Sequence, residues 1–289
     1  MSTKHTKTFK AFQNKHNLSY SNFFTFSNPK VLKNEKVEIP TAILMLMNTP
    51  KACPAAGSCR SVCLITSGNP IYLDNKIKCR IRRNNAFMSD YSIFLRYLVV
   101  NCFRHYAKHR GTDKVSFRLN GVSDYKFEDM SVKLTSEDTD YIKKAFNIFI
   151  EPIRYGSVIE AVQKAIDLNN NELLKNSVQF YDYTKRIDRN FDKCKNELNY
   201  HLTLSHGSKF DTFSKALELG LNYAAAFNLK KSQDLPKEFT YNGIKLNVID
   251  GDITDYRPLD DNNKTNIVGL HFKIVVNKDN AKKLDFCIA

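Results

Sequence analysis

The chain alternates short apolar runs with longer stretches in which apolar residues recur every three or four positions. Residues 37–47 form the first apolar run and predict a buried strand. Neither proline nor glycine occurs between Ile71 and Arg110, and the apolar residues there have helical spacing. This stretch predicts one long amphipathic helix or two, ending near Gly111.

The rest of the chain repeats this alternation. It predicts strands over residues 114–120, 177–183, 201–205, 223–227, 243–249 and 267–274, and helices over 137–150, 158–168 and 211–219. Short apolar strands that alternate with helices are typical of a parallel sheet. We therefore predict an α/β fold in which residues 36–289 form a single domain, a partial or complete (β/α) barrel. Residues 1–35 are polar and predict a loosely ordered N-terminal arm, or an early strand at residues 23–26.

The charge of the chain is strongly basic. Lysine and arginine number 44 against 30 acids, which gives a formal net charge of +14 at pH 7. Basic proteins of this kind usually bind a polyanion, so a nucleic acid or a nucleotide substrate is the predicted partner. The alternative is that the charge only aids solubility.

The cysteine pattern and the N-terminal sequence indicate the cellular compartment in which the protein is expected. The seven cysteines are an odd number with three crowded together, which is unlike the framework of a secreted disulfide-rich protein. No signal peptide is visible, and no stretch reaches the ~18 apolar residues of a membrane span. We therefore expect a cytoplasmic protein that has no membrane partner and whose thiols serve metals.

The three crowded cysteines, Cys53, Cys59 and Cys63, follow the first predicted core strand and have small residues between them. Three thiolates on one loop can hold an iron–sulfur cluster with one open position. They can also hold zinc if a fourth ligand joins them, such as Cys79, Cys102 or a histidine. The alternative is that they are buried free cysteines. The predicted cofactor is thus an iron–sulfur cluster or zinc.

Polar residues cluster just after several predicted strands. Because the carboxyl ends of parallel strands meet at one edge of the sheet, we expect these residues to form one site. The predicted catalytic residues are Asp124, Asp182 and Lys185, and the predicted cofactor-binding residues are Asn120, Gly121, Ser123, Ser205, His206 and Ser208. Alternatives are a helix-capping turn at 120–124 and a surface ion pair between Asp182 and Lys185.

Two charged segments have alternative interpretations. A basic run at the start of the long helix suits phosphate binding, or is a solvated helix face; it comprises Lys76, Lys78, Arg80, Arg82 and Arg83. Three acids, Asp250, Asp252 and Asp255, stand close to Arg257, which suits an oxygen-ligand metal loop or, as we favour, a self-paired turn.

Several motifs carry a family resemblance. The segments C-P-x-x-G-x-C-x-x-x-C, F-Y-D-Y-T-K, L-S-H-G-S and G-D-x-x-D-x-R-P…V-G-L-H-F-K resemble, in this order, the phage "gene product 88" family across residues 40–275. The resemblance implies a phage origin, hence the host cytoplasm, more than a particular reaction.

The layout also resembles the radical S-adenosylmethionine superfamily, in which a strand, a three-cysteine loop, a helix and a second strand with a short turn follow one another. Here the cysteine spacing is C-x5-C-x3-C, whereas that superfamily usually has C-x3-C-x2-C. This resemblance implies S-adenosylmethionine as a candidate cofactor. A looser similarity to phage base-exchange transglycosylases implies a zinc site with Asp124 and Asp182 as the reacting acids.

The predicted function is therefore a phage-encoded metalloenzyme that modifies nucleic acid or a nucleotide precursor. The alternatives are a transglycosylase that exchanges guanine for a deazaguanine in DNA, and a non-catalytic, zinc-stabilised protein that binds DNA or a host protein.

Overall fold

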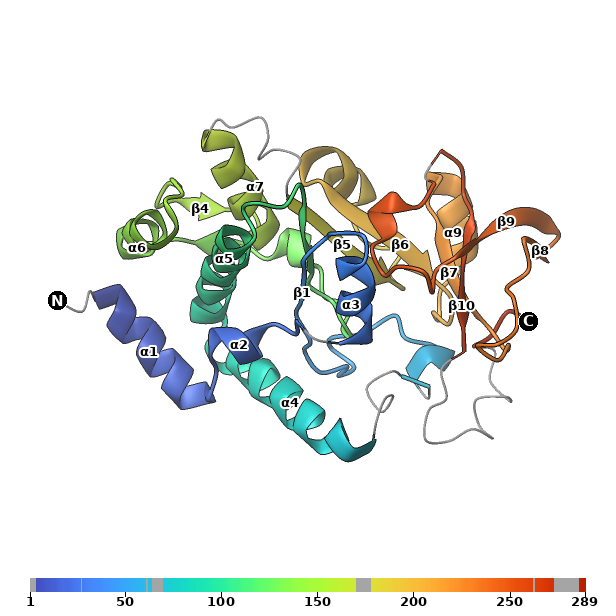
Figure 1. The fold of residues 1–289 in the computed structure, drawn as a ribbon, viewed down its shortest axis with the longest axis horizontal. Coiled ribbons are helices and arrows are strands. Elements are labelled where there is room, and N and C mark those ends of the chain that lie inside the picture. The colour runs from blue at the N-terminus through green and yellow to red at the C-terminus, as the bar shows by residue number, and fades with distance from the viewer. Residues whose placement is uncertain are drawn as a thin grey trace.

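The structure is a computed structural model, and it describes residues 4–289 apart from 27, 61, 64–69, 170–177, 262 and 273–285. Its centre is an eight-stranded sheet with helices around it (Figure 1). In sheet order the strands are β1 (Thr41–Ile43), β2 (Val115–Arg118), β5 (Val178–Thr184), β6 (Tyr200–Ser205), β7 (Tyr223–Phe227), β10 (Ile267–His271), β9 (Ile244–Asp250) and β8 (Glu238–Tyr241).

Seven of these strands are parallel, and only β8 runs antiparallel to its neighbour β9. From β1 to β7 the order in the sheet follows the order in the chain, and β10 comes next to β7. The carboxyl ends of β1, β2, β5, β6, β7 and β10 therefore lie along one edge of the sheet. A separate antiparallel pair joins β3 (Val132–Lys133) to β4 (Arg154–Tyr155).

The helices connect and cover the strands. They are α1 (Lys4–His16), α2 (Tyr20–Phe23), α3 (Pro29–Glu35), α4 (Leu73–Ser89), α5 (Tyr91–Lys108), α6 (Ser136–Phe146), α7 (Val158–Leu168) and α9 (Thr212–Leu219). The long apolar-periodic stretch is thus two helices, α4 and α5, and Asp90 lies between them. The remaining predicted helices occur where expected, with shorter ends for α6. No described helix is both long enough and apolar enough to cross a membrane.

The two faces of the sheet differ because successive side chains of a strand point to opposite sides. On one face the rings of Phe117 and Phe180 stack, with His105 of α5 against Phe117. This face belongs to the main hydrophobic core. On the other face Thr41, Ser116 and Tyr181 are polar, and Asn34 of α3 donates hydrogen bonds to Thr41 and Tyr181 at 2.9 Å. The polar face is therefore covered by a short helix that hydrogen-bonds to it.

The N-terminal segment differs from the loosely ordered arm and early strand that the sequence predicts. It forms α1, α2 and α3, and Phe9, Phe12, Phe23 and Phe24 are buried in the same core as the sheet. The sequence did not predict a helix with an apolar face here, because the many lysines between the phenylalanines lower the mean hydropathy of the segment. Among the described residues of this segment, only Thr25 takes part in strand-like pairing, with Ile43 at the outer edge of β1.

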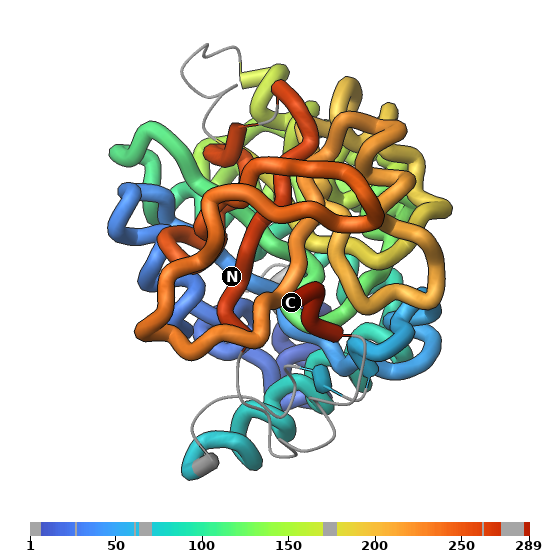
Figure 2. The backbone as a smooth tube through the Cα atoms, turned by 90° about the vertical axis from the view of Figure 1, so that its right-hand side faces the viewer, coloured from blue at the N-terminus to red at the C-terminus, as the bar shows by residue number. Residues whose placement is uncertain are grey.

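The α/β class and the mainly parallel sheet are confirmed, whereas closure into a barrel is not seen. Within the described residues, β1 pairs with β2 on one side and with Thr25 on the other, so it does not meet β8. The C-terminal residues return to the middle of the sheet (Figure 2). There the Ile288 N–H donates to the Ala226 carbonyl oxygen, and the Asn228 N–H donates to the Ala289 carbonyl oxygen, at the end of β7.

Candidate functional site

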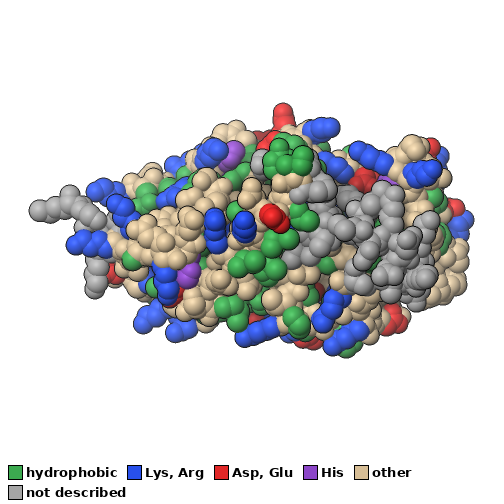
Figure 3. Space-filling view, turned by 90° about the horizontal axis from the view of Figure 1, so that it is seen from below, with side chains coloured by type: hydrophobic (Ala, Val, Ile, Leu, Met, Phe, Trp, Pro, Cys, Tyr) green, Lys and Arg blue, Asp and Glu red, His purple; other side chains and the backbone are tan. Residues whose placement is uncertain are grey.

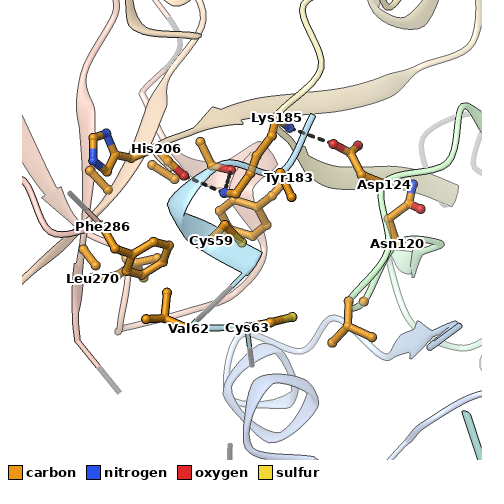
Figure 4. A pocket seen from close by; sticks show the side chains of 18 of the residues that line it. Cys59, Val62, Cys63, Asn120, Asp124, Tyr183, Lys185, His206, Leu270 and Phe286 are labelled. Carbon is orange, nitrogen blue, oxygen red and sulfur yellow. Dashed lines mark hydrogen bonds between the residues drawn. The ribbon is translucent and has the colours of Figure 1, made fainter. Parts of the chain in front are cut away.

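A pocket of about 230 Å³ lies at the carboxyl ends of the parallel strands. Its walls include residues that follow β1, β2, β5 and β6, as well as the ends of β7 and β10 (Figure 4). This is the edge of the sheet that the sequence predicts for the site. Of the predicted residues, those that line it are Cys53, Cys59, Cys63, Asn120, Gly121, Ser123, Asp124, Lys185, Ser205 and His206.

The loop that carries the cysteines crosses this edge of the sheet from β1 to the turn after β6. The backbone N–H groups of Gly57 and Cys59 both donate to the carbonyl oxygen of Gly207, at 3.0 and 3.3 Å. Ala56 and Ser208 form an isolated bridge, and a Cβ on Gly57 would lie 2.8 Å from the Ser208 backbone. Gly57 is therefore required by the close approach of two backbones.

The three thiols line one pocket without forming a ready-made metal site. In the described part of the chain, no three His, Cys, Asp or Glu side chains lie close enough together to hold a metal ion. Burial first, then the charges of Asp124, Cys63 and Cys59, raises the pKa of Cys53 to about 12. The thiols are thus near enough to oppose one another's ionisation. Cys102, considered from sequence as a fourth ligand, is fully buried in the hydrophobic core and does not line the pocket.

The turn after β2 is rigid because its side chains bond to its own backbone. The Asn120 side chain donates to the carbonyl oxygen of Tyr125 and accepts from the Tyr125 N–H and the Ser123 hydroxyl. A Cβ on Gly121 would lie within 3.0 Å of Ile43, Met45 and the Leu44 carbonyl. The side chains of Asn120 and Ser123 therefore serve to shape the turn. The groups of this turn that can contact a ligand in the pocket are its backbone groups and the Asp124 side chain.

Asp124 is buried, and three groups surround its carboxylate. It accepts the Thr184 hydroxyl at 2.8 Å and the backbone N–H of Lys185 at 2.9 Å, and it faces Arg189 at 3.5 Å. Burial raises the pKa of Asp124, although Arg189 and the Lys185 N–H act to lower it. Arg189 in turn makes a bidentate pair with Glu128, in which neither side chain is exposed.

Lys185 joins the ends of β5 and β6. Its ammonium group donates to the Ser205 hydroxyl at 2.8 Å and to the His206 carbonyl oxygen at 2.6 Å (Figure 4). Ser208 does not line the pocket; its hydroxyl donates to the carbonyl oxygens of Ala55 and Lys185 and so holds the cysteine loop to β5. Ser208 is thus a residue that supports the loop, whereas the sequence predicts a cofactor contact.

Asp182 is fully buried and does not line the pocket. Its carboxylate accepts the backbone N–H groups of Leu119 and Asn120 and the Tyr200 hydroxyl, at 3.2, 2.8 and 2.7 Å. It therefore fixes the end of β2 from the side of the hydrophobic core. The prediction that Asp182 and Lys185 act together gains no support from this placement, because Lys185 follows β5 and its ammonium group donates to Ser205 and His206.

Arg118 and its pairing with Asp255 were not predicted from the sequence. Arg118 donates to Asp255 at 2.7 Å and stacks on the Tyr183 ring at 4.7 Å, and all three residues line the pocket. Arg257, the predicted partner of the nearby acids, instead pairs with Asp260. A charged residue in an otherwise apolar strand, as Arg118 is in β2, is the signal that could have indicated a buried ion pair.

Part of the pocket wall is apolar. It is formed by Val62 of the cysteine loop, Leu270 at the end of β10 and Phe286, which lies beside Phe272 (Figure 4). Since β7 contributes only Ala224, Ala225 and Ala226 here, the wall leaves space for a ligand.

The basic run in α4 divides into two groups. Arg80 and Arg83 are buried; Arg83 donates to the carbonyl oxygens of Asn22 and Met45, and burial lowers its pKa to about 10. These two are not surface residues, so the prediction that they bind nucleic acid is corrected. Lys76, Lys78 and Arg82 remain at least partly exposed, and the face seen from below carries many lysine and arginine side chains (Figure 3).

Comparison with models of protein families matches residues 3–288 to Gene product 88. No curated protein and no solved structure gives a significant match. The resemblances to radical S-adenosylmethionine enzymes and to transglycosylases gain no support from these comparisons. The family match covers nearly the whole chain and agrees with the motifs that first indicated it. The chain therefore belongs to the Gene product 88 family.

Proposed function

We propose that this protein is a metalloenzyme that holds an iron–sulfur cluster at Cys53, Cys59 and Cys63 and acts on a nucleotide or on nucleic acid. The observation that carries the proposal is that three thiols of one loop line the same pocket, at the carboxyl ends of parallel strands. Such edges are where α/β enzymes bind their ligands.

The residues suit a soft metal in chemical type and in location. Thiolates are the preferred ligands of iron–sulfur clusters. A bound cation would favour the thiolate of Cys53, whose pKa is raised by burial first and then by the charges of Asp124, Cys63 and Cys59. The docking of Gly57 on Gly207 holds the loop over the pocket. Because the thiols do not meet in the described structure, we expect loading to draw the loop together, as metal binding and local folding are coupled.

A cluster held by Cys53, Cys59 and Cys63 would supply an electron to a cofactor bound in the pocket, for which S-adenosylmethionine is the candidate. The protein's own residues have separate tasks. The Asn120–Asp124 turn and Tyr183 shape the pocket beside the loop, and Lys185 provides a fixed cation. Val62, Leu270 and Phe286 keep one wall apolar.

Base exchange has less support. That reaction needs one carboxylate to attack the sugar and a second acid to move the proton. Asp124 is in the pocket, but Asp182 does not line it, and its carboxylate accepts hydrogen bonds from two backbone N–H groups, the Asn120 side chain and the Tyr200 hydroxyl. We therefore do not propose a transglycosylase.

Reconstitution with iron and sulfide under anaerobic conditions tests the proposal. The wild-type protein is expected to turn brown and to bind iron and sulfide in fixed ratio, and Cys53→Ser, Cys59→Ser and Cys63→Ser are each expected to lose most of both. Cys194→Ala is the matched control because Cys194 is buried away from the pocket.

Two results would contradict the proposal. A colourless protein that binds one zinc and no iron would instead support the non-catalytic zinc-binding alternative. A protein that binds neither metal, or one whose iron content is unchanged in all three serine variants, would exclude the cysteine loop as a metal centre.

A further inference from the structure

Lys185 places an ammonium group in the pocket of the proposed metalloenzyme. The group is held by the Ser205 hydroxyl at 2.8 Å and by the His206 carbonyl oxygen at 2.6 Å (Figure 4). An ammonium has three N–H donors, and these two acceptors use two of them. Both acceptors are uncharged, so they fix the position of the ammonium without neutralising it.

Two other cations that line the pocket pair with acids of the protein, whereas Arg60, which also lines it, is exposed and donates to the Cys53 carbonyl oxygen. Arg118 pairs with Asp255 at 2.7 Å, and Lys33 pairs with Asp252 at 3.2 Å. For Lys185, by contrast, no carboxylate of the described residues forms an ion pair with the ammonium group.

Asp124 is close to Lys185 but has other partners. Its carboxylate accepts the Lys185 backbone N–H and the Thr184 hydroxyl, and it forms an ion pair with Arg189. Its negative charge is thus shared with a buried arginine. A positive charge in a pocket of low polarity is stabilised by a negative group that binds beside it.

The surroundings of Lys185 restrict the shape of that ligand. Leu270 and Phe286 lie on one side of Lys185 in the pocket, and Asn120 and Asp124 lie on the other (Figure 4). A ligand that fills this space needs an anionic group for Lys185 and a flat, largely apolar part that can lie against Leu270 and Phe286.

We propose that Lys185 binds the carboxylate or phosphate of a nucleotide-like ligand, whose base lies against the apolar wall formed by Leu270 and Phe286. This inference deepens the proposed function, since it rests on the pocket being the substrate or cofactor site. Adenosine nucleotides carry the anionic group as a phosphate, and adenosyl amino acids carry it as a carboxylate.

Calorimetric titration of the full-length protein, with and without reconstituted metal, tests this inference. The ligands are AMP, S-adenosylmethionine and, as the probe that has no anionic group, adenosine. We expect Lys185→Met to weaken the binding of AMP or of S-adenosylmethionine about tenfold or more, because it removes a charge-assisted hydrogen bond. Adenosine binding should stay unchanged, and Lys185→Arg should restore most of the affinity.

AMP and S-adenosylmethionine distinguish the two sources of the negative group, since one carries a phosphate and the other a carboxylate. If Lys185→Met weakens the binding of AMP alone, the site binds a phosphate. If it weakens the binding of S-adenosylmethionine alone, the site binds a carboxylate. Lys215→Met, which removes the same charge from the outer face of α9, is the control and should bind like the wild type. Circular dichroism and thermal melting verify that each variant is folded.

The inference is overturned if the wild type binds neither AMP nor S-adenosylmethionine, or if Lys185→Met binds both as tightly as the wild type. It is also overturned if Lys185→Met lowers only the metal content, because Lys185 would then serve the thiolates. Lys185-dependent binding by a protein that takes up no metal would support the inference while contradicting the proposed function, so the two can fail separately.

Discussion

The backbone N–H of Gly57 donates a hydrogen bond to the carbonyl oxygen of Gly207 at 3.0 Å. This hydrogen bond joins the loop after the first strand of the sheet to the turn after the fourth, and it spans the edge where β2 and β5 end. The cysteine loop is therefore part of the pocket wall, and its position depends on backbone contacts as much as on the cysteines.

A methyl group at position 57 should disturb this hydrogen bond. In Gly57→Ala the new Cβ would lie 2.8 Å from the Ser208 carbonyl carbon and oxygen, which are backbone atoms and cannot rotate away. We expect a loss of about 1–3 kcal/mol in the free energy of unfolding, as for overpacked sites, and reduced metal uptake. Urea unfolding and metal analysis measure the two effects.

Gly111→Ala is the control for that substitution. Nothing lies within 4 Å of a Cβ at Gly111, so the free energy of unfolding should rise by no more than about 1 kcal/mol. Equal stability and equal metal uptake in Gly57→Ala and Gly111→Ala would mean that the loop does not need its close approach to Ser208.

The ion pair between Arg118 and Asp255 should make stability depend on pH in the acid range. Burial alone raises the pKa of Asp255, but Arg118, Lys30 and Arg257 more than offset this, so the pKa falls to about 2. The unfolded chain has an aspartate pKa of about 4. The ionised carboxylate therefore contributes its full stabilisation, about 3 kcal/mol, above pH 4, and loses it as the pH falls from 4 to 2.

Asp255→Asn removes this contribution and leaves the buried Arg118 with the more distant carboxylate of Asp182, at 3.7 Å. We expect a destabilisation of about 3 kcal/mol or more at pH 7, measured by urea unfolding. The difference from the wild type should become smaller below pH 4. Asp234→Asn, on an exposed residue, should change stability at neither pH. A wild-type–variant difference that stays constant from pH 7 to pH 3 would contradict the assigned pKa direction.

The pair between Arg189 and Glu128 should show strong coupling. Because neither side chain is exposed, Arg189→Met leaves a carboxylate buried without its cation, and we expect a cost of about 3–5 kcal/mol. Adding Glu128→Met should recover part of that loss, since the uncompensated charge is removed with it. A double variant whose cost equals the sum of the two single costs would show that the pair is not coupled.

The exposed cations of α4 should contribute to any binding of nucleic acid. The triple variant Lys76→Gln, Lys78→Gln and Arg82→Gln should flatten the salt dependence of duplex binding by about 0.9 in logarithmic slope for each phosphate that the protein no longer neutralises. Fluorescence anisotropy at several salt concentrations measures this slope.

A triple variant of equal charge, Lys230→Gln, Lys231→Gln and Lys237→Gln, is the control on the β8 side of the protein. If both triple variants have the same slope, the α4 residues do not form a specific binding surface. If the wild type binds no nucleic acid even at low salt, the net charge serves another purpose.

The sequence by itself determined the alternation of strands and helices. Val158–Leu168 and Tyr223–Phe227 have the bounds that periodicity predicts, because their apolar residues are packed on one side or buried throughout. It also determined that Asn120, Asp124 and Lys185 would meet, since residues that follow parallel strands share one edge of the sheet. Local pattern was sufficient in these cases.

Only the tertiary structure decided what depends on contacts between distant segments. Periodicity could not show that Arg83 is buried against Asn22, that Asp182 points to the core rather than the pocket, or that Arg118 pairs with Asp255. A charged side chain has the same local pattern whether it is solvated or paired inside the protein. The difference lies in desolvation and in partners far away in the sequence, which exist only once the chain has folded.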